Sequence, residues 1–343
     1  MDTNYEFFTH VFGYKYRPTV PMLQTGGLFD LFLDENIRDL KNLLKSAPEY
    51  CRTQYKLVIG PWTHGGIPIN PSAGISLKKM VEVFRNFFPF GWFDYWMKGP
   101  DKKDLMTPMV RIYVLNRNLW RNFNTWPPKS HEMKFYLHSQ GHANSRIGDG
   151  GLSTVEPQVE PSDEYDFNPA SPVTTQGGRN LVLSAGELNQ SKLEARSDIL
   201  VYTSDKLKEG LEIIGEIKII LYAVSSAKDT DFMVKLVDVF PNGRKALNLL
   251  DNGIRARFRD GDLKSPALLE PDAVYRYEID LGTTAVYFPK DHRIRIEISS
   301  SNYPKYDINS NLAGERNEKG FIVASQKIFH DAQYRSHLIL PVF

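Results

Sequence analysis

Apolar residues in the first hundred positions alternate between patterns typical of strands and of helices. The apolar segment Val20–Gly27 ends in two glycines, and the amphipathic segment Asp34–Ala47 follows it. A second apolar run, Tyr55–Gly60, has the continuous hydrophobicity of a buried strand, and Ser76–Phe88 predicts another helix, which Pro89 ends. The order strand, helix, strand, helix predicts parallel strands joined by a right-handed crossover.

After about residue 105 the apolar positions alternate with a period of two. Isoleucines alternate with charged residues in Asp291–Ser301, and a similar alternation occurs in Val274–Leu281 and Gly215–Ala223. Such alternation is typical of antiparallel strands that are buried on one face only. Turn sequences such as FPNGR and FRDGD separate these segments. The pattern predicts an all-β sandwich of about 200 residues after an α/β part.

The length of 343 residues allows two domains, which we assign to residues 1–105 and 106–343. Basic residues number 42 and acidic residues 41, so the sequence predicts no surface for nucleic acid or anionic lipid. The one cysteine, Cys51, excludes an internal disulfide. No apolar run approaches the ~18 residues of a membrane span, and the N-terminal segment has no apolar core of an export signal. We therefore expect a cytoplasmic protein without a membrane partner.

Two polar residues follow the two predicted parallel strands, at the point where each strand ends. Asp30 lies in GGLFD after the first strand, and His64 lies in GPWTHGG after the second. Because the carboxyl ends of adjacent parallel strands meet at one edge of the sheet, we expect these side chains to meet. A carboxylate bonded to one imidazole nitrogen leaves the other nitrogen free to take a proton from a nucleophile. Taken singly, such an Asp is often a helix cap and such a His is often a surface residue.

A nucleophile for this pair is not evident in the sequence. In α/β-hydrolases the chain order is a serine on a G-x-S-x-G turn, then Asp, then His. None of the 29 residues before Asp30 is a serine. Ser76, Ser139, Ser153 and Ser184 each have only one of the two glycines of the turn. The sequence therefore contains two thirds of a triad.

Several segments resemble one family of serine hydrolases. GGLFDLFLDENIRDLKNLL, YKLVIGPWTHGG and GWFDYWMKG are similar, in this order, to the second half of the hydrolase domain of the cocaine esterase and X-prolyl dipeptidyl peptidase family. TDFMVKLVDVFPNGR, NGIRARFR, HRIRIEISSSNYPKYDINSN and FHDAQYRSHLILPV are similar to its C-terminal jelly-roll domain. The resemblance implies an α/β plus all-β fold, in which a partial α/β-hydrolase sheet precedes a jelly-roll β-sandwich. It also implies that Asp30 and His64 are the triad acid and base.

The same resemblance places the family's nucleophile, oxyanion-hole residues and helical cap outside this sequence. Three interpretations follow: a fragment, a subunit whose partner chain supplies the serine, or a former enzyme retained as a binding module. Half of a parallel sheet exposes unpaired hydrogen-bonding groups, so we expect a complementary N-terminal hydrolase segment or self-association. We expect the chain alone to be inactive, because loss of the nucleophile from a triad lowers turnover by a factor of about 10⁶.

The residues around the pair favour one branch of the family. Relatives that hydrolyse α-amino acid esters carry acidic residues after the triad Asp, whereas three apolar residues follow Asp30 here, as in the cocaine-esterase type. Phe29, Leu31 and Trp62 are candidates for an apolar acyl or leaving-group pocket, or for simple packing. The predicted function is part of a serine hydrolase that cleaves ester or X-Pro amide bonds in small-molecule or peptide substrates. The alternative is a carbohydrate- or protein-binding β-sandwich.

Other candidate residues carry weaker predictions, and no cofactor or metal is predicted. His138 and His142 have an i, i+4 spacing, but a strand end and a glycine turn surround them, so we do not expect them to share a helix face. Asp260 and Asp262 in FRDGDL are typical of a turn. The row of aromatic residues over Phe87–Trp96 predicts packing between the two domains.

Overall fold

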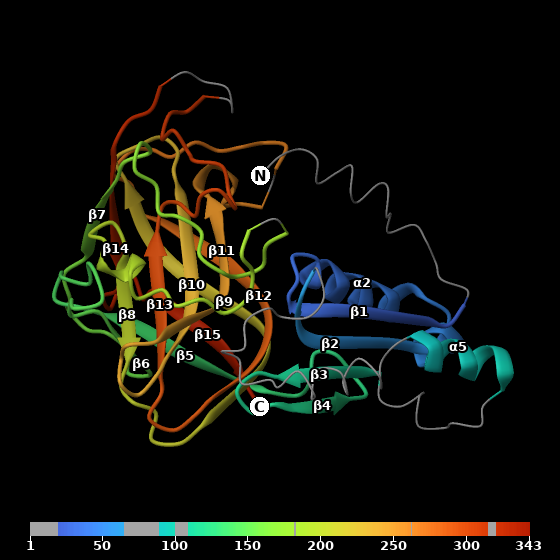
Figure 1. The fold of residues 1–343 in the computed structure, drawn as a ribbon. Coiled ribbons are helices and arrows are strands. Elements are labelled where there is room, and N and C mark those ends of the chain that lie inside the picture. Colours follow the sequence, from blue (N-terminus) through green and yellow to red (C-terminus); the bar gives the residue numbers. More distant parts are fainter. Residues whose placement is uncertain (1–19, 65–88, 100–108, 182, 262, 315–319) are drawn as a thin grey trace.

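The computed structural model describes residues 20–64, 89–99, 109–181, 183–261, 263–314 and 320–343 (Figure 1). These residues form two sheets that share one hydrophobic core: a four-stranded sheet near the N-terminus, and an eleven-stranded sheet that makes up most of the remainder. The fold is therefore mostly β, with mixed sheets. No helix within these ranges combines the length and the hydrophobicity that crossing a bilayer requires.

The four-stranded sheet has the strand order β1-β2-β3-β4. β1 is parallel to β2, β2 is parallel to β3, and β4 is antiparallel to β3. The elements of this part are β1 (Met22–Phe29), α2 (Leu33–Ser46), α3 (Glu49–Thr53), β2 (Tyr55–Thr63), α5 (Pro89–Lys98), β3 (Val110–Val114) and β4 (Leu119–Phe123). The predicted pair of parallel strands joined by a helix is confirmed. The helix predicted over residues 76–88 lies outside the described residues.

Helix α2 packs one apolar face against the sheets, because its apolar residues recur every three or four positions. Leu33, Ile37 and Leu40 are buried on this face. Two acidic residues lie in the first turn of the helix and a lysine in the last, which suits the helix dipole. Phe29, at the end of β1, is also buried, so the turn between β1 and α2 is anchored in the core at both ends.

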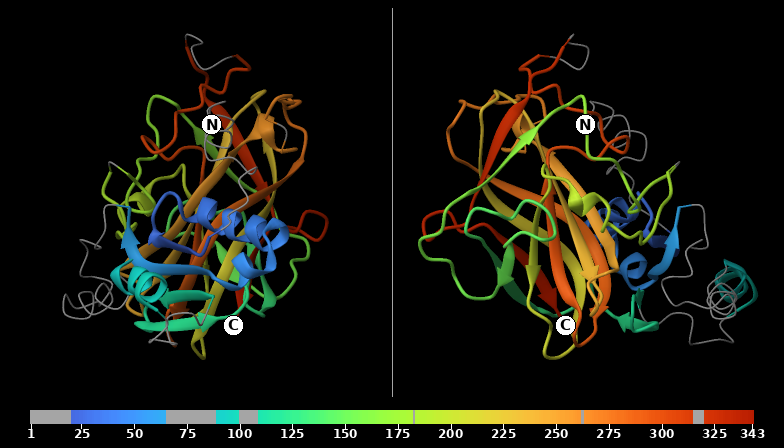
Figure 2. Two further views of the ribbon diagram at one scale, coloured as in Figure 1. Left: turned by 90° about the vertical axis from the view of Figure 1, so that its right-hand side faces the viewer. Right: turned by 60° about the vertical axis from the view of Figure 1, so that its left-hand side comes forward.

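The eleven-stranded sheet curls around most of the shared apolar core (Figures 1 and 2). Its strand order is β11-β10-β13-β8-β6-β5-β15-β9-β14-β7, and β12 pairs with β9. The strands are β5 (His131–His138), β6 (Gly151–Ser153), β7 (Asp163–Phe167), β8 (Leu200–Ser204), β9 (Leu211–Ser225), β10 (Asp231–Val239), β11 (Ala246–Arg255), β12 (Tyr275–Phe288), β13 (Arg293–Ser299), β14 (Ala324–Phe329) and β15 (His337–Val342). The alternating isoleucines of β13 are fully buried, as predicted. The arrangement agrees with a β-sandwich, and its jelly-roll topology stays a prediction.

The opposite face of β13 is buried as well, so the prediction of strands open to water on one face is wrong for this strand. Glu297 is 2% and Arg295 is 7% exposed. Glu194, in a short 3-10 helix (Leu193–Ala195) before β8, lies 2.6 Å from Nη1 of Arg295, and Nζ of Lys235 lies 3.7 Å from Glu297. Charged residues at alternate positions predict a polar face, but they do not distinguish a face covered by water from one covered by other charged residues.

A backbone bridge and an ion pair join the small sheet to the sandwich. The N–H of Leu115, just after β3, donates to the carbonyl oxygen of Ala285 in β12, and the N–H of Tyr287 donates to the carbonyl oxygen of Leu115. Arg121 of β4 lies 2.8 Å from Glu212 of β9. Both views in Figure 2 show the small sheet and α2 against one side of the sandwich. These contacts hold the two sheets in one relative position.

The predicted boundary between residues 105 and 106 does not coincide with the change from one sheet to the other. The boundary itself falls outside the described residues. β3 and β4, which follow it in the chain, belong to the sheet of β1 and β2. The alternation of apolar and polar residues predicts that a segment is a strand, but it does not predict which sheet the strand joins.

The aromatic residues predicted to pack between the domains do not do so in the described part of the row. On α5, Phe93 is 55% and Trp96 is 37% exposed, while Trp92 is buried. Tyr95 and Trp96 contact each other edge to face, with ring centroids 5.1 Å apart. Figure 1 shows α5 on the side of the small sheet that faces away from the sandwich. Residues 87 and 88 lie outside the described residues.

Candidate active site

Asp30 and His64 lie side by side because β1 and β2 end together. In the parallel register of these strands, Phe29 pairs with Thr63. The next residue is Asp30 in one strand and His64 in the other. The predicted meeting of the two side chains is confirmed, since Nδ1 of His64 lies 3.2 Å from Oδ1 and 3.3 Å from Oδ2 of Asp30.

The turn after β1 holds the Asp30 carboxylate in place. The backbone N–H of Asp30 donates to the carbonyl oxygen of Gly27 at 3.0 Å, and the N–H of Leu33 donates to the carbonyl oxygen of Asp30 at 3.2 Å. The N–H of Phe32 donates to Oδ1 of the carboxylate at 2.9 Å, which forms an Asx turn. The side chain is 13% exposed. The chain therefore fixes the carboxylate independently of the imidazole.

The imidazole is the more exposed partner. The side chain of His64 is 40% exposed, and the ring of Phe32 contacts it edge to face with centroids 5.1 Å apart. A carboxylate at Nδ1 favours the tautomer that carries its proton there and leaves Nε2 as an acceptor. Among the residues that the structure describes, none forms a hydrogen bond with Nε2. Within the described part of the chain, the nitrogen that would face a nucleophile thus has no hydrogen-bond partner.

The three residues predicted to bind substrate lie next to the pair but differ in burial. Phe29 is 2% exposed and belongs to the core, whereas Leu31 and Trp62 are half-buried. The ring of Trp62 covers Gly60, where a Cβ atom would overlap it, and lies 6.4 Å from the ring of Trp120. Phe29 therefore contributes packing. Leu31 and Trp62 stay predictions as substrate contacts.

Two residues at this site were not found from the sequence. Phe32 touches His64, and the local indication was its position two residues after an Asp in a turn. Arg179, with a side chain 7% exposed, contacts Leu28 and Asp34 on either side of the Asp30 turn. These contacts span 151 and 145 residues of the chain, a separation that no local pattern crosses.

The structure does not bring His138 and His142 together as metal ligands. Nδ1 of His138 lies 2.7 Å from a carboxylate oxygen of Glu160, and His142 is exposed. Asp260 is exposed, and Asp262 lies outside the described residues. Within the described ranges, no three His, Cys, Asp or Glu side chains gather as metal ligands would.

The sequence of residues 105–339 matches the family described as the X-Pro dipeptidyl-peptidase C-terminal non-catalytic domain. The chain belongs to this family. Over 332 residues it is 34% identical to the cocaine esterase of Rhodococcus sp. (strain MB1 Bresler), and the match covers 94% of this chain and 56% of that protein. The chain spans about half the length of the curated relatives it matches. The predicted resemblance to the C-terminal part of the X-Pro dipeptidyl-peptidase and cocaine esterase family is confirmed.

Two solved structures share the fold of this chain over 96% of its length. An aminopeptidase from the marine sediment archaeon Thaumarchaeota archaeon is 26% identical, with a TM-score of 0.79. An α-amino acid ester hydrolase is 24% identical, with a TM-score of 0.81, a likeness of fold alone. Each match covers 56% of the other chain. By sequence the chain thus belongs to the family of the C-terminal non-catalytic domain, and it shares its fold with part of each of these two solved structures.

Proposed function

We propose that residues 1–343 contribute the acid and the base of a serine-hydrolase triad that cleaves ester or X-Pro amide bonds. Asp30 orients His64, and Nε2 of His64 takes the proton of a serine hydroxyl carried by a segment outside these residues. The observation that carries the proposal is the 3.2 Å contact of His64 Nδ1 with the Asp30 carboxylate at the ends of two adjacent parallel strands. The 34% identity to a cocaine esterase supports hydrolase chemistry.

The pair moves one proton in each half of the reaction. His64 accepts the hydroxyl proton as the serine oxygen attacks the substrate carbonyl, and it then donates that proton to the departing alcohol or amine. Water attacks the acyl intermediate in the same manner, and the acid is released. Asp30 stabilises the imidazolium that forms in both halves. Because the Phe32 amide already holds the carboxylate, little reorganisation is needed at the moment of proton transfer.

Strand β1 is the place where a nucleophile-bearing segment would join the molecule. In the described sheet, β1 pairs with β2 on one side only. An unpaired strand edge favours the addition of another strand. His64 and Phe32 contact each other beyond the ends of β2 and β1, and both side chains are exposed. The partner in this proposal is a complementary hydrolase segment, joined to this chain or on a second polypeptide, which makes the small sheet part of an α/β-hydrolase domain.

The surroundings of the pair favour an uncharged acyl or leaving group. The three residues after Asp30 are apolar, so none of them offers a carboxylate to a substrate ammonium. Leu31 and Trp62 are half-buried and supply apolar surface beside the pair. Both residues would contact the substrate, while Phe29 supports them from the core.

A chimera tests the proposal. Residues 1–343 replace the 56% of the Rhodococcus cocaine esterase that aligns with them, and hydrolysis of a chromogenic aryl ester is followed. We expect activity that His64→Ala lowers by about 10⁶-fold. The control variant His131→Ala, at an exposed position in β5, should leave activity unchanged. A folded chimera that lacks activity, or whose activity survives His64→Ala, contradicts the proposal.

The family's description as non-catalytic favours a second candidate, a binding module for carbohydrate or protein. A hollow of about 640 Å³ lies over β5, β9, β12 and β15, and its lining includes Lys218, Glu278 and Ile339. No residue of the Asp30 turn lines this hollow, so the two candidates respond to different substitutions. Retention on a glycan or peptide array that Lys218→Glu abolishes and His64→Ala does not would favour the binding module.

A further inference from the structure

Arg179 lies where the sandwich meets the small sheet, in the loop that precedes β8. Its side chain is 7% exposed, and its guanidinium donates in three directions. Nε donates to the carbonyl oxygen of Leu28 at 3.0 Å, and Nη1 donates to Oδ2 of Asp34 at 2.6 Å. Nη2 donates to the carbonyl oxygen of Thr283 in β12. Leu28 precedes Asp30 by two residues and Asp34 follows it by four, so one side chain binds both ends of the turn that carries Asp30.

Strand β12 of the sandwich also binds Asp34 directly. The N–H of Thr283 donates to Oδ1 of Asp34 at 3.0 Å, so both carboxylate oxygens of Asp34 are bound. Gly282 permits the close approach, because it has a φ of +96° and a Cβ atom there would lie 2.6 Å from Asp34 and 2.7 Å from Arg179. Residues of the sandwich therefore contribute to the position of α2 relative to β1.

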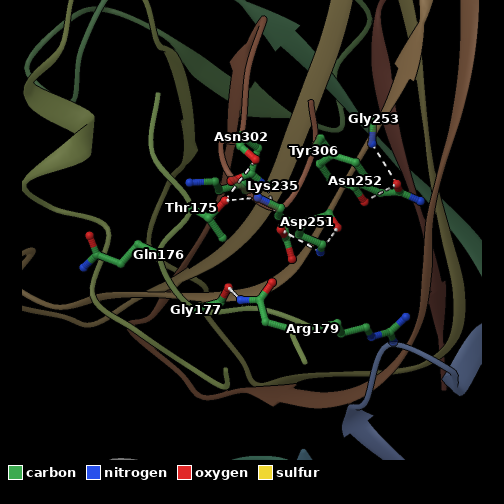
Figure 3. A network of polar contacts seen from close by, with 12 residues as sticks. Thr175, Gln176, Gly177, Arg179, Lys235, Asp251, Asn252, Gly253, Asn302 and Tyr306 are labelled. Carbon is green, nitrogen blue, oxygen red and sulfur yellow. Dashed lines mark hydrogen bonds and ion pairs between the residues drawn. The ribbon is translucent and has the colours of Figure 1, made fainter. Parts of the chain in front are cut away.

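The loop that carries Arg179 is itself held by a buried polar network (Figure 3). Oγ1 of Thr175 donates to the carbonyl oxygen of Asn302 at 2.9 Å, and Nδ2 of Asn302 donates to Asp251 at 2.7 Å. Gly178 lies against the Asp251 carboxylate so closely that a Cβ atom would overlap it. Figure 3 shows Arg179 extending from this network toward the blue segment of β1 and α2. The backbone that carries the guanidinium is thus held in place on the sandwich.

We infer that Arg179 is a positioning residue, which aligns the Asp30 carboxylate with His64 by binding Leu28 and Asp34. The inference rests on the proposed function and assigns the sandwich a role in it. Arginine suits the position because its rigid planar fork donates in several directions at once, whereas lysine concentrates its charge at one point. Loss of the guanidinium removes the bonds to Leu28 and Asp34 and leaves the Thr283 N–H as the bond from the sandwich to Asp34, without touching Asp30 or His64.

The tautomer of His64 in the full chain is the readout. Histidine-selective ¹⁵N NMR at about pH 9, where imidazoles are neutral, gives the ratio of Nδ1–H to Nε2–H forms, and His64→Ala identifies the resonance. We expect Asp30→Asn to lower this ratio about tenfold, because a hydrogen bond to a charged group is lost. We expect Arg179→Met to lower the ratio at least about threefold. If the Met variant does not fold, Arg179→Lys is measured in its place, and we expect it to lower the ratio as well.

Arg257→Met is the matched control. Nε of Arg257 donates to Asp229 at 2.8 Å and Nη2 to the carbonyl oxygen of Gly314 at 3.1 Å, so its bonded partners lie in the sandwich. This variant should lower the melting temperature without moving the His64 ratio. If Asp30→Asn changes the ratio and the Arg179 variants do not, or if Arg257→Met changes it equally, the inference is overturned and the proposed function stands. If Asp30→Asn has no effect, the Asp30–His64 bond is absent and the proposed function fails.

Discussion

His64 follows Asp30 by 34 residues in the chain and lies 3.2 Å from it across two parallel strands. The contact depends on the register of β1 with β2, because a slip by one residue would turn one of the two side chains to the other face of the sheet. Buried apolar residues at the strand ends oppose such a slip. The pair is therefore a product of the same core packing that stabilises the sheet.

The carboxylate of Asp30 should matter for turnover far more than for folding. In the chimera, we expect Asp30→Asn to lower kcat by about 10⁴-fold, because the imidazole loses the charge that fixes its tautomer. The asparagine oxygen can still accept the N–H of Phe32, so the melting temperature should change little. Steady-state kinetics and a thermal melt provide the two measurements. A tenfold effect or smaller on kcat would show that Asp30 does not act as the triad acid.

Alanine substitutions of Phe29 and Leu31 should have different effects, because Phe29 packs in the core and Leu31 is proposed to contact the substrate. Phe29 is almost completely buried, so Phe29→Ala should lower the free energy of unfolding by about 3–5 kcal/mol in urea titrations. Leu31 is half-buried, so Leu31→Ala should mainly raise the KM of the chimera for a bulky aryl ester. The assignment of Leu31 to the pocket is wrong if its truncation affects stability and leaves KM unchanged.

A charged cluster lies inside the sandwich. Nε2 of His330 is 2.9 Å from Asp163 and Nδ1 is 3.2 Å from Glu160. Burial alone would lower the pKa of His330, but the hydrogen bond and charge of Asp163 and the charge of Glu160 raise it above its ordinary value. Burial alone would raise the pKa of Asp163, but hydrogen bonds from His330, from a backbone N–H and from two hydroxyl groups hold it below its ordinary value.

Removal of His330 should therefore destabilise the chain in a pH-dependent way. We expect His330→Ala to lower the free energy of unfolding by about 3–5 kcal/mol near pH 6, because it leaves buried carboxylates unpaired. The stabilisation from a raised histidine pKa is complete below about pH 6.5 and is lost as the pH rises through the folded-state pKa. The stabilisation from Asp163, whose pKa is lowered, is present above about pH 3.8 and is lost as the pH falls.

Urea titrations of the wild type and of His330→Ala at several pH values measure this pH dependence. The difference in unfolding free energy between the wild type and His330→Ala should be widest between about pH 4 and 6.5 and should narrow at higher pH. A difference that widens as the pH rises would mean that His330 is neutral in the folded chain.

Lys56 of β2 should reduce stability at neutral pH. It is 9% exposed, and burial, followed by the charge of Arg111, lowers its pKa to about 8. Below about pH 8 the folded chain carries a buried ammonium, so we expect Lys56→Met to raise the free energy of unfolding by about 2 kcal/mol at pH 7. Between about pH 8 and 10.5 the unfolded chain binds more protons, so the wild type gains stability and the advantage of the variant shrinks.

Chemical unfolding at several pH values measures this effect, and Lys98→Met, at a position 75% exposed, is the control that should change stability little. An advantage of Lys56→Met that is independent of pH up to 10.5 would point to better packing and not to the removal of a buried charge.

The sequence predicted those features of the candidate site that depend on residues close together in the chain. Asp30 and His64 each follow a short apolar run, and chain order alone brings two such strand ends together. The burial of Phe29 and the contact of Phe32 with His64 depend on side-chain orientation within a turn, which apolar character does not specify. Arg179 was missed because its partners are more than a hundred residues away.

The amino-acid sequence by itself determined the parallel strands, the helix between them, the inward isoleucines of β13 and the placement of Asp30 and His64 at neighbouring strand ends. These features follow from periods of two and of 3.6 residues and from the order of elements along the chain. Only the tertiary structure decided that β3 and β4 extend the first sheet, that Glu297 is covered, and that Arg179 binds both ends of the Asp30 turn. Those features join distant parts of the chain, and their partners are selected by how the whole chain folds back on itself.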